Sequence, residues 1–527
     1  MSKPSEFWQD GGGFGDEYIF LISGCLEVNM NDQCFFRMLV SMCLLYLEQN
    51  IPLKIWVIVN RMCIGRMLIS LSLQNQSANG REIIMASLNQ RVRTWQFNIH
   101  CPAHQRNWTH ISQRIAEQAC QGFPIRIIVI DTNDELITVE ASFLIGDRKP
   151  IWPSLLSPPR QLRHQSSNTQ VVVSIIPTGV RAEIGGFAGD ATPSMNLLAS
   201  VCDYLVVNPN TVTASDLYFA SDNIQYVEGN LICRFMLGQL GLLPVCQQTV
   251  GLVVEKPREE NFLRNVQNAV NAMRTVAGVD INPVVVTDKP IRTTCTFSDF
   301  GHASGEYGEL DELYAGIDVV CDTAVQAVGL VTSLDVSDAV RNAYYAGQPI
   351  PNPWGAAEAI LTHLTTSFYP VTAAHSPLLL EAGHTMFGTL GDPRDGAELI
   401  SSAFLCSMVR GLSQSPKVLP IENLMEHTND SSISVSDVSA VVMPESVVGN
   451  IPFFTAMELN IPVILVRDNS TIFNVTPERI GIDLSKENIH IVNSYAEAAG
   501  LLIALREGIN PHALKRPVSA VELTHLV

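Results

Sequence analysis

The segment from Val171 to Pro193 constrains the fold of this chain more than any other. An apolar, β-branched run from Val171 to Ile176 predicts a buried strand. Four glycines lie in the loop that follows: Gly179, Gly185, Gly186 and Gly189. An apolar helical pattern begins after Pro193. Because glycine lets the backbone approach a ligand closely, this order of strand, loop and helix is typical of an α/β protein with a ligand site at the loop.

The composition limits the partners of the chain. Of its 527 residues, 46% are apolar and 16% are charged, which indicates a globular protein of about three domains. The formal net charge of −19 argues against binding to nucleic acid or to anionic membranes, since both require clustered Lys and Arg. We therefore expect no nucleic-acid and no membrane partner. The composition is compatible with a homo-oligomer.

The 12 cysteines do not predict a metal site, because no C-x-x-C pair has a matching second pair. Scattered cysteines without a secretory signal indicate a reducing compartment. We expect a cytoplasmic protein, or one of the plastid stroma if the source is a photosynthetic eukaryote.

Residues 1–84 differ in composition from the rest of the chain. Residues 18–73 are unusually apolar, but Arg37, Glu48 and Lys54 interrupt their best window. No apolar run reaches the roughly 18–20 residues that a membrane-spanning helix needs. One interpretation is that Met85 is the natural start of the protein, and the alternative is that residues 1–84 are a native extension.

Residues 85–150 predict a small β-α-β-β domain. The elements expected there are a strand at 94–100, a helix at 107–121 and strands at 125–130 and 136–144. Three prolines and several serines then predict a linker over residues 151–168.

Residues 169–347 predict a first α/β lobe. Its expected strands are 171–176, 204–207, 224–227, 251–255 and 283–287. Polar residues follow these strands: Thr178, Asp190, Asn208, Asn210, Glu228 and Asp288. Open parallel sheets bind ligands outside the carboxyl ends of their strands, so we expect these residues to line one rim. The alternative is that they only cap strands and helices.

The loop of residues 177–190 does not match a known cofactor motif. It lacks the G-K-[ST] of a P-loop, and its spacing differs from the dinucleotide fingerprint G-x-G-x-x-G. The cofactor is therefore unknown. A second glycine-rich stretch, residues 294–307, is expected to be a lid that carries His302 or a mobile surface loop.

Residues 348–527 predict a second parallel-sheet lobe, with strands at 438–443, 461–466 and 489–492. Glu358 and His363 lie about 140° apart around a helix and do not share a face. A metal site made by His363, His375 and Asp322 is conceivable, since imidazole and carboxylate are suitable ligands. No ligand spacing supports it, and we predict no metal site.

Several long motifs carry a family resemblance: PTGVRAEIGGFAGDATP, VVNPN, YVEG, VVTD, NPWGAAEAILTH, AHSP, VNSY and INPHAL. From about Val171 to the C-terminus the chain resembles the cyanobacterial and plastid family known as domain of unknown function 3326. The family implies no activity. Its members usually carry glycine where this chain has Arg181 and tyrosine where it has Phe187, so ligand specificity is expected to differ if either position contacts a ligand.

These observations predict an α/β protein with two Rossmann-like parallel-sheet lobes, a cleft between them and a small preceding α+β unit. We expect a soluble enzyme, of unknown reaction class, that binds a small anionic metabolite. Asp190 or Glu228 would be the general acid or base, with His363 or His375 opposite. The expected ligand-binding residues are Thr178, Gly179, Gly185, Gly186, Gly189, Asn208, Asn210, Asp288, Asn352 and Glu358. The alternatives are a non-catalytic sensor or partner-binding scaffold, and a metal-dependent hydrolase.

Overall fold

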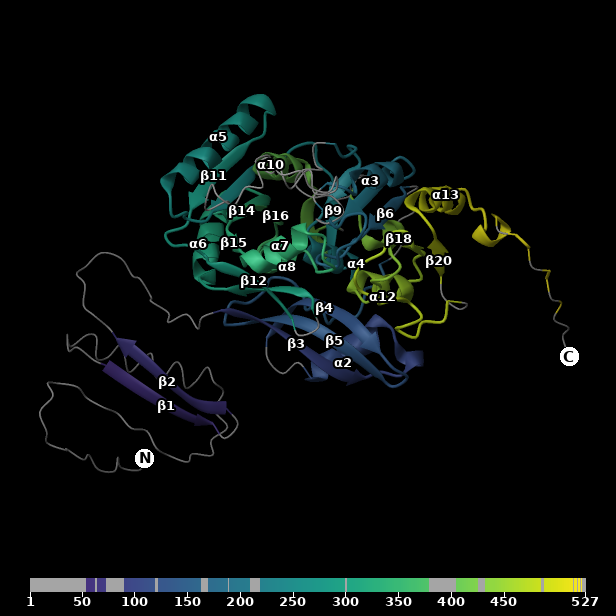
Figure 1. Cartoon of the computed structure of the whole chain (residues 1–527), viewed down its shortest axis with the longest axis horizontal. Helices are drawn as coiled ribbons and strands as arrows, with labels where there is room; N and C mark the ends of the chain where they lie inside the picture. Colours follow the sequence, from purple (N-terminus) through teal and green to yellow (C-terminus); the bar gives the residue numbers. More distant parts are fainter. Residues whose placement is uncertain are drawn as a thin grey trace, which may run out of the picture. The chain divides into compact units, whose positions relative to one another are not determined.

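The computed structural model divides the chain into two compact units, Met1–Leu88 and Asn89–Val527. It describes residues 54–61, 64–72, 90–118, 122–162, 169–187, 189–208, 219–298, 301–378, 404–424, 432–484, 488–514, 516–518, 520, 521 and 523. In the first unit, strands β1 (Lys54–Arg61) and β2 (Ile64–Ser72) form an antiparallel pair (Figure 1). All other elements belong to the second unit.

A six-stranded parallel sheet forms one half of the second unit. Its strands are β6 (Val171–Ser174), β7 (Tyr204–Val207), β8 (Ile224–Tyr226), β18 (Val438–Pro444), β19 (Val463–Val466) and β20 (Ile489–Val492). Their spatial order is β20-β19-β18-β6-β7-β8. Numbered along the chain and read from β8, this is the 3-2-1-4-5-6 order of a doubly wound sheet. Such a sheet has its switch point between strands 1 and 4, here β6 and β18.

Both faces of this sheet are covered, which explains why its central strands are mostly apolar. Side chains alternate across a strand, so Val171 and Val173 pack with α4 (Gly229–Met236) and α12 (Ile451–Glu458). Val172, between them, packs with α3 (Thr192–Ala199) and α13 (Tyr495–Arg506) on the opposite face (Figure 1).

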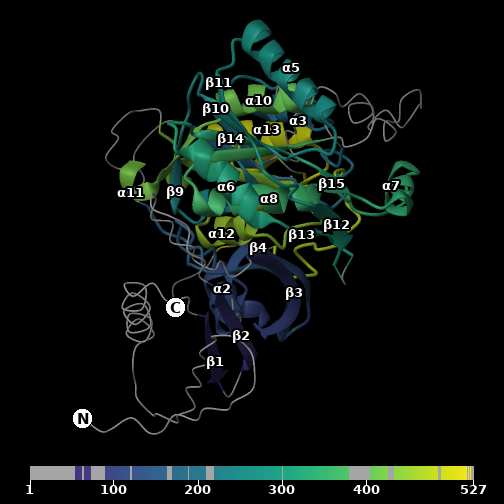
Figure 2. The ribbon, with the colours of Figure 1, turned by 90° about the vertical axis from the view of Figure 1, so that its left-hand side faces the viewer.

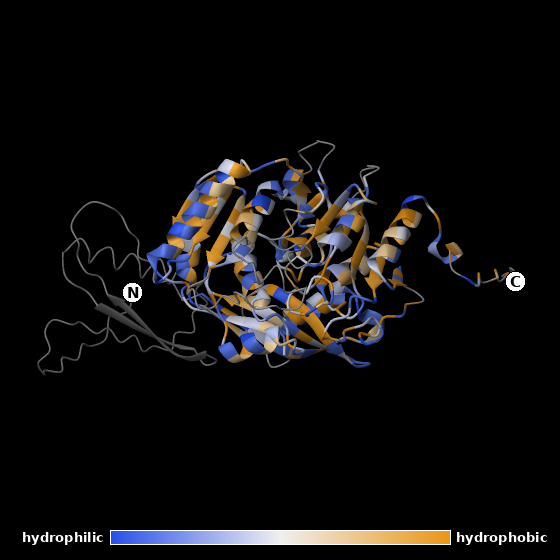
Figure 3. Ribbon diagram, turned by 45° about the horizontal axis from the view of Figure 1, so that its top comes forward, coloured by the Kyte–Doolittle hydropathy of each residue, from blue (hydrophilic) through white to orange (hydrophobic). Residues whose placement is uncertain are grey.

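A four-stranded parallel sheet forms the other half. It contains β10 (Val250–Val254), β11 (Ile281–Val286), β14 (Ala327–Thr332) and β16 (Thr372–Pro377), in the order β11-β10-β14-β16. Helices α5 (Glu260–Val276) and α10 (Phe404–Gln414) cover one face, and α6 (Leu310–Cys321) and α8 (Gly355–Phe368) the other. Figure 3 shows apolar colour on the strands and hydrophilic colour on the outer sides of helices.

The expected α/β class is confirmed, but the division into consecutive lobes at residue 347 does not describe the sheets. The six-stranded sheet joins β6–β8 to β18–β20, and the four-stranded sheet joins β14 to β16, so both cross that boundary. A β-α-β pattern predicts which strands run parallel. It does not reveal that the segment from β10 to β16 is inserted between the third and fourth strands of another sheet.

The small α+β region at the start of the second unit contains the expected elements: β3 (Arg91–His100), α2 (Trp108–Gln118), β4 (Phe123–Thr132) and β5 (Leu136–Ile145). The strands form an antiparallel sheet in the order β3-β5-β4. The connection that follows β5 packs against helix α8, since Trp152 is buried and its Nε1 donates to the Thr366 carbonyl over 2.7 Å.

Residues 294–307 are not the expected lid or surface loop. They form most of a hairpin of β12 (Thr293–Phe297) and β13 (Ala303–Tyr307), with β15 (Leu334–Asp335) beside β12. Figure 2 shows the hairpin near β3. The remaining elements are β9 (Leu240–Leu243), β17 (Lys417–Pro420), α7 (Asp338–Tyr345), α11 (Ile421–Leu424), η1 (Ala103–Gln105), η6 (Val435–Asp437) and η7 (Pro511–Leu514).

Candidate functional site

Helix α8 connects the parts of the candidate site. At its first residue, Gly355, an added Cβ would lie 2.9 Å from the Thr178 methyl group, so the glycine-rich loop touches the start of this helix. Glu358 and His363 follow on the same helix. A rise of 1.5 Å per residue places Gly355 and His363 about 12 Å apart along the axis.

Glu228 lies where the chain leaves β8 and enters α4. It is the N-cap of α4, and its carboxylate accepts the backbone N–H groups of Asn230 (2.9 Å) and Leu231 (3.2 Å). A carboxylate at this position satisfies N–H groups that have no partner within the helix. Glu228 is fully buried.

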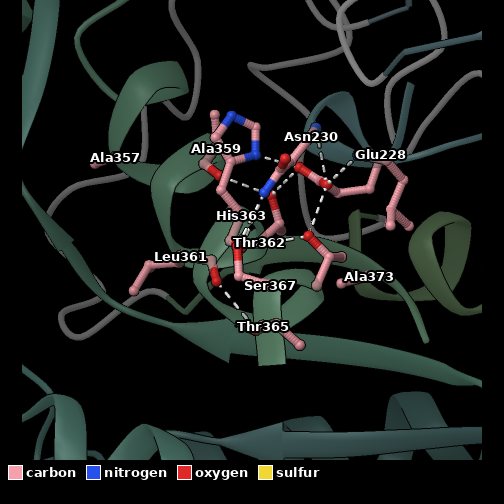
Figure 4. A network of polar contacts seen from close by, with 12 residues as sticks. Glu228, Asn230, Ala357, Ala359, Leu361, Thr362, His363, Thr365, Ser367 and Ala373 are labelled. Atoms are coloured by element: carbon pink, nitrogen blue, oxygen red, sulfur yellow. Dashed lines mark hydrogen bonds and ion pairs between the residues drawn. The ribbon is translucent and has the colours of Figure 1, made fainter. Parts of the chain in front are cut away.

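Helix α8 supplies three further donors to the same carboxylate, and Figure 4 shows Thr362 and His363 beside Glu228. The Thr362 and Thr366 hydroxyls donate over 3.1 and 3.0 Å, and His363 Nδ1 makes a short contact with Oε1. Burial alone would raise the pKa of Glu228, but the charge of His363 and the hydrogen bonds from His363, Thr366 and Leu231 outweigh it and lower the pKa. Glu228 is therefore an ionised group held by five donors.

The network orients His363. With Nδ1 directed at Glu228, the hydrogen bonding assigns the Nδ1–H tautomer to the neutral ring and leaves Nε2 as the free nitrogen. Within the described part of the chain, Nε2 makes no hydrogen bond, and 13% of the side chain is exposed. The ring can therefore exchange a proton with a small molecule at Nε2.

The sequence prediction missed four members of this network: Asn230, Thr362, Thr366 and Ser367. Asn230 Nδ2 donates to Ser367 Oγ over 3.0 Å, which ties α4 to the end of α8. A signal was present, because buried hydroxyl residues interrupt the otherwise apolar AILTHLTTSF run of α8.

His375 and Glu358 form a second imidazole–carboxylate pair. His375 Nδ1 lies 3.3 Å from Glu358 Oε1, and its Nε2 lies 2.8 Å from the Thr332 hydroxyl. The His375 side chain and Thr332 are almost inaccessible, so the imidazole faces the protein interior, whereas 32% of the Glu358 side chain is exposed. The structure thus gives Glu358 and His363 different partners, as their angular separation on α8 implies.

The glycine-rich loop is closed by its own carboxylate. Asp190 Oδ1 accepts the Gly185 N–H over 2.7 Å, so that N–H is not available to a ligand as expected. Gly179, Gly185 and Gly189 have positive φ angles of 77°, 86° and 88°, which favour glycine. An added Cβ at Gly186 would lie 2.0 Å from the Ala182 carbonyl oxygen. These glycines therefore shape the loop itself.

The predicted rim is present only in part. Asn208, at the end of β7, accepts the Ile176 N–H and donates to the Ile176 carbonyl, which fixes the start of the loop. Thr178, Asp190, Asn208 and Glu228 follow strands of the six-stranded sheet. Asp288 follows β11 of the other sheet, and its N–H donates to Glu312. Asn210 lies outside the described residues.

Arg181 and Phe187 pack against the segment that leads into α8. The Arg181 guanidinium carbon lies 5.8 Å from the centre of the Tyr344 ring, and the Phe187 ring lies 5.8 Å from the same ring. Asn352 Nδ2 donates to the Tyr344 hydroxyl, and its Oδ1 accepts the N–H groups of Trp354 and Gly355. Asn352 therefore caps the start of α8 beside the loop.

His302, the residue expected on a lid, is buried and lies 3.1 Å from Glu140 of β5. Arg126 and Gln96 also bind Glu140, over 2.9 and 3.0 Å. Burial would raise the pKa of Glu140, but the His302 hydrogen bond and the charges of Arg126 and His302 lower it far below its ordinary value. The Glu140–His302 pair connects the small α+β region to the β12–β13 hairpin.

The described part of the chain contains no group of three or more His, Cys, Asp and Glu side chains arranged to hold a metal ion. His363 and His375, which a metal site with Asp322 would require, contact different carboxylates, Glu228 and Glu358. Within the same residues, no helix has the length and apolar character needed to cross a membrane.

Comparisons with known proteins agree on one family. The model of a family described as protein of unknown function (DUF3326) matches residues 171–515. An uncharacterised lipoprotein of Synechococcus sp. is 29% identical over 349 residues, which cover 65% of this chain and 92% of that protein. No solved structure matches the chain.

Proposed function

The chain belongs to the DUF3326 family, and we propose that it is an enzyme in which His363 exchanges a proton with a small anionic metabolite. The Glu228–His363 pair is the observation that carries this proposal. Glu228 is a positioning residue rather than the base, because its oxygens are already occupied by five donors. The proposal thus assigns general acid–base catalysis to His363 alone.

An imidazole held at Nδ1 by a buried carboxylate, with Nε2 free, is the arrangement used by general acid–base histidines. The carboxylate fixes the tautomer and stabilises the imidazolium that forms when Nε2 takes a proton. A histidine with only a structural role has no need of an unoccupied nitrogen at the surface. The exposed fraction of His363 supports the catalytic role.

The metabolite is proposed to extend from His363 toward the loop of residues 177–190. The loop meets α8 at Gly355, about 12 Å from His363 along the axis, which is the length of a small metabolite. The positive end of the α8 dipole lies there and favours a negative group. The loop also follows β6, at the switch point where doubly wound sheets bind ligands.

The test is an activity screen with a matched variant. The full chain is incubated with phosphorylated and carboxylate metabolites, and mass spectrometry follows their conversion. We expect His363→Gln to lower the rate of any conversion at least 100-fold. His512→Gln, a change at an exposed histidine of η7, should keep the wild-type rate. Equal conversion by the two variants would remove His363 from the mechanism. Thermal unfolding of each variant shows whether it is folded.

The same screen separates the alternative functions. A metabolite that raises the unfolding temperature but is never converted favours a sensor, because binding to the native state stabilises it. No stabilising metabolite favours a partner-binding scaffold. Stoichiometric metal in the purified protein, together with metal-dependent conversion, favours a hydrolase of that class.

A cytoplasmic or stromal location is also part of the proposal. The Synechococcus relative is named a lipoprotein, so the location needs its own test. We expect the native protein in the high-speed supernatant of source cells. Recovery in the membrane pellet, with release by detergent alone, would contradict that location.

A further inference from the structure

We propose that Arg181 binds an oxyanion of the ligand, a carboxylate or a phosphate, at the junction of the glycine-rich loop and the start of α8. This inference rests on the proposed function and names the group by which the ligand is recognised. The site lies between residues 178–181 and the segment 344–355. The observations that carry it are the backbone conformation of Arg181, the state of its guanidinium and its neighbours.

The backbone of Arg181 is in an unfavourable conformation. Its φ is 47°, in the left-handed region where a side chain other than glycine costs free energy. Such conformations persist where the surrounding structure holds them, often at ligand sites. Glycine would relax this position, so the arginine side chain has to be explained by something other than the fold of the loop.

The guanidinium has hydrogen-bonding capacity to spare. Its Nη1 atom is buried and has no hydrogen-bond partner among the residues that the structure describes. The Tyr344 ring, 5.8 Å from the guanidinium carbon, holds the group by a cation–π contact, which uses none of its N–H donors. The loop carboxylate at Asp190 is bound to the Gly185 N–H instead. The arginine therefore keeps donors for an external acceptor.

The neighbours of Arg181 suit an oxyanion. Thr178 touches the start of α8, where the helix dipole is positive, and Asn352 caps the same end beside Tyr344. Guanidinium binds carboxylate and phosphate through two parallel hydrogen bonds, which an ammonium group cannot reproduce. Phosphate and a dicarboxylate are therefore suitable probes, and they distinguish the two classes of oxyanion.

The experiment measures thermal unfolding of the full chain with inorganic phosphate or malonate, against sodium chloride of equal ionic strength. Arg292→Gly is the matched control, because Arg292 is an exposed arginine that also has a left-handed φ, of 60°. It loses the same charge and gains the same backbone relief on another loop. We expect one probe to raise the unfolding temperature of the wild type and of Arg292→Gly, and to leave Arg181→Gly unshifted.

Arg181→Lys should keep less than half of the rise in unfolding temperature, because lysine retains the positive charge but lacks the paired N–H donors of the guanidinium. Equal shifts in wild type and Arg181→Gly, or no shift beyond chloride in the wild type, would overturn the assignment. His363→Gln separates this inference from the proposed function. If His363→Gln binds the probe normally and converts metabolites as well as the wild type, the proposed chemistry fails and the oxyanion site stands. If His363→Gln abolishes conversion while Arg181→Gly still binds the probe, the oxyanion site fails and the proposed chemistry stands.

Discussion

At the scale of single residues, the contact between Glu228 and His363 is the centre of the candidate site. Glu228 and His363 were both expected as acid or base, and the structure brings them into direct contact. The sequence could not show that Glu228 caps a helix, because α4 was not predicted. It also could not show that Thr362 and Thr366 saturate the carboxylate, since that depends on how α4 packs against α8.

The network predicts a large cost for neutralising Glu228. In Glu228→Gln the side-chain NH₂ would face N–H and O–H donors in a buried site, so we expect unfolding in urea to require about 2–4 kcal/mol less free energy. Glu117→Gln removes an exposed carboxylate paired with Arg114 and should change stability by less than about 0.5 kcal/mol. Similar values for the two variants would show that the five donors contribute little.

At the scale of elements, hydrophobic periodicity located most strands and helices, because strands buried on both faces and amphipathic helices leave clear patterns. The β12–β13 hairpin was mistaken for a loop. Its residues are mostly Thr, Ser, Gly and Glu, and half-buried or exposed positions prevail in it, so no apolar alternation marks the strands. Glycine content predicted a ligand loop at residues 177–190 but did not reveal that Asp190 accepts the Gly185 N–H.

Two glycines, one in the loop and one in helix α13, predict opposite effects of substitution by alanine. Gly186→Ala would place a methyl group 2.0 Å from the Ala182 carbonyl oxygen, and we expect it to destabilise the chain by about 3 kcal/mol or more. Gly500→Ala lies in helix α13, where among the described residues no atom beyond the chain neighbours and the helix's own backbone comes within 4 Å of the added carbon; it should stabilise the chain by about 0.5–1 kcal/mol. Urea unfolding of both variants checks the signs, and a neutral Gly186→Ala would mean that the loop relaxes easily.

At the scale of the whole molecule, the strand pattern predicted parallel sheets but not their membership. Asp288 was placed on the rim with Glu228 because both follow strands, yet β11 belongs to the four-stranded sheet. Long-range pairing between β6 and β18 leaves no local signal in a single sequence. Helix α8, which touches the loop and carries Glu358 and His363, is the element that brings distant parts of the site together.

Two buried carboxylates predict how the fold responds to acid. The pKa values of Glu140 and Glu228 are lower in the folded chain than the ordinary value of about 4.3, so the unfolded chain binds more protons as the pH falls through that range. Their contribution is complete above the unfolded pKa and is lost toward the folded values. We expect the unfolding free energy to fall steadily below about pH 5. Glu140→Gln should lose less stability between pH 6 and 4 than the wild type, and an equal loss would contradict this origin.

The tautomer of His363, observed by NMR with ¹⁵N-labelled histidine, tests directly whether Glu228 orients the ring for proton exchange. The His363→Gln variant assigns the signal. At alkaline pH, where an ordinary imidazole is neutral, we expect a proton on Nδ1, bound to Glu228, and a bare Nε2. A proton on Nε2, with a bare Nδ1, would contradict the proposed role of His363, because Glu228 would then not be orienting the ring for proton exchange.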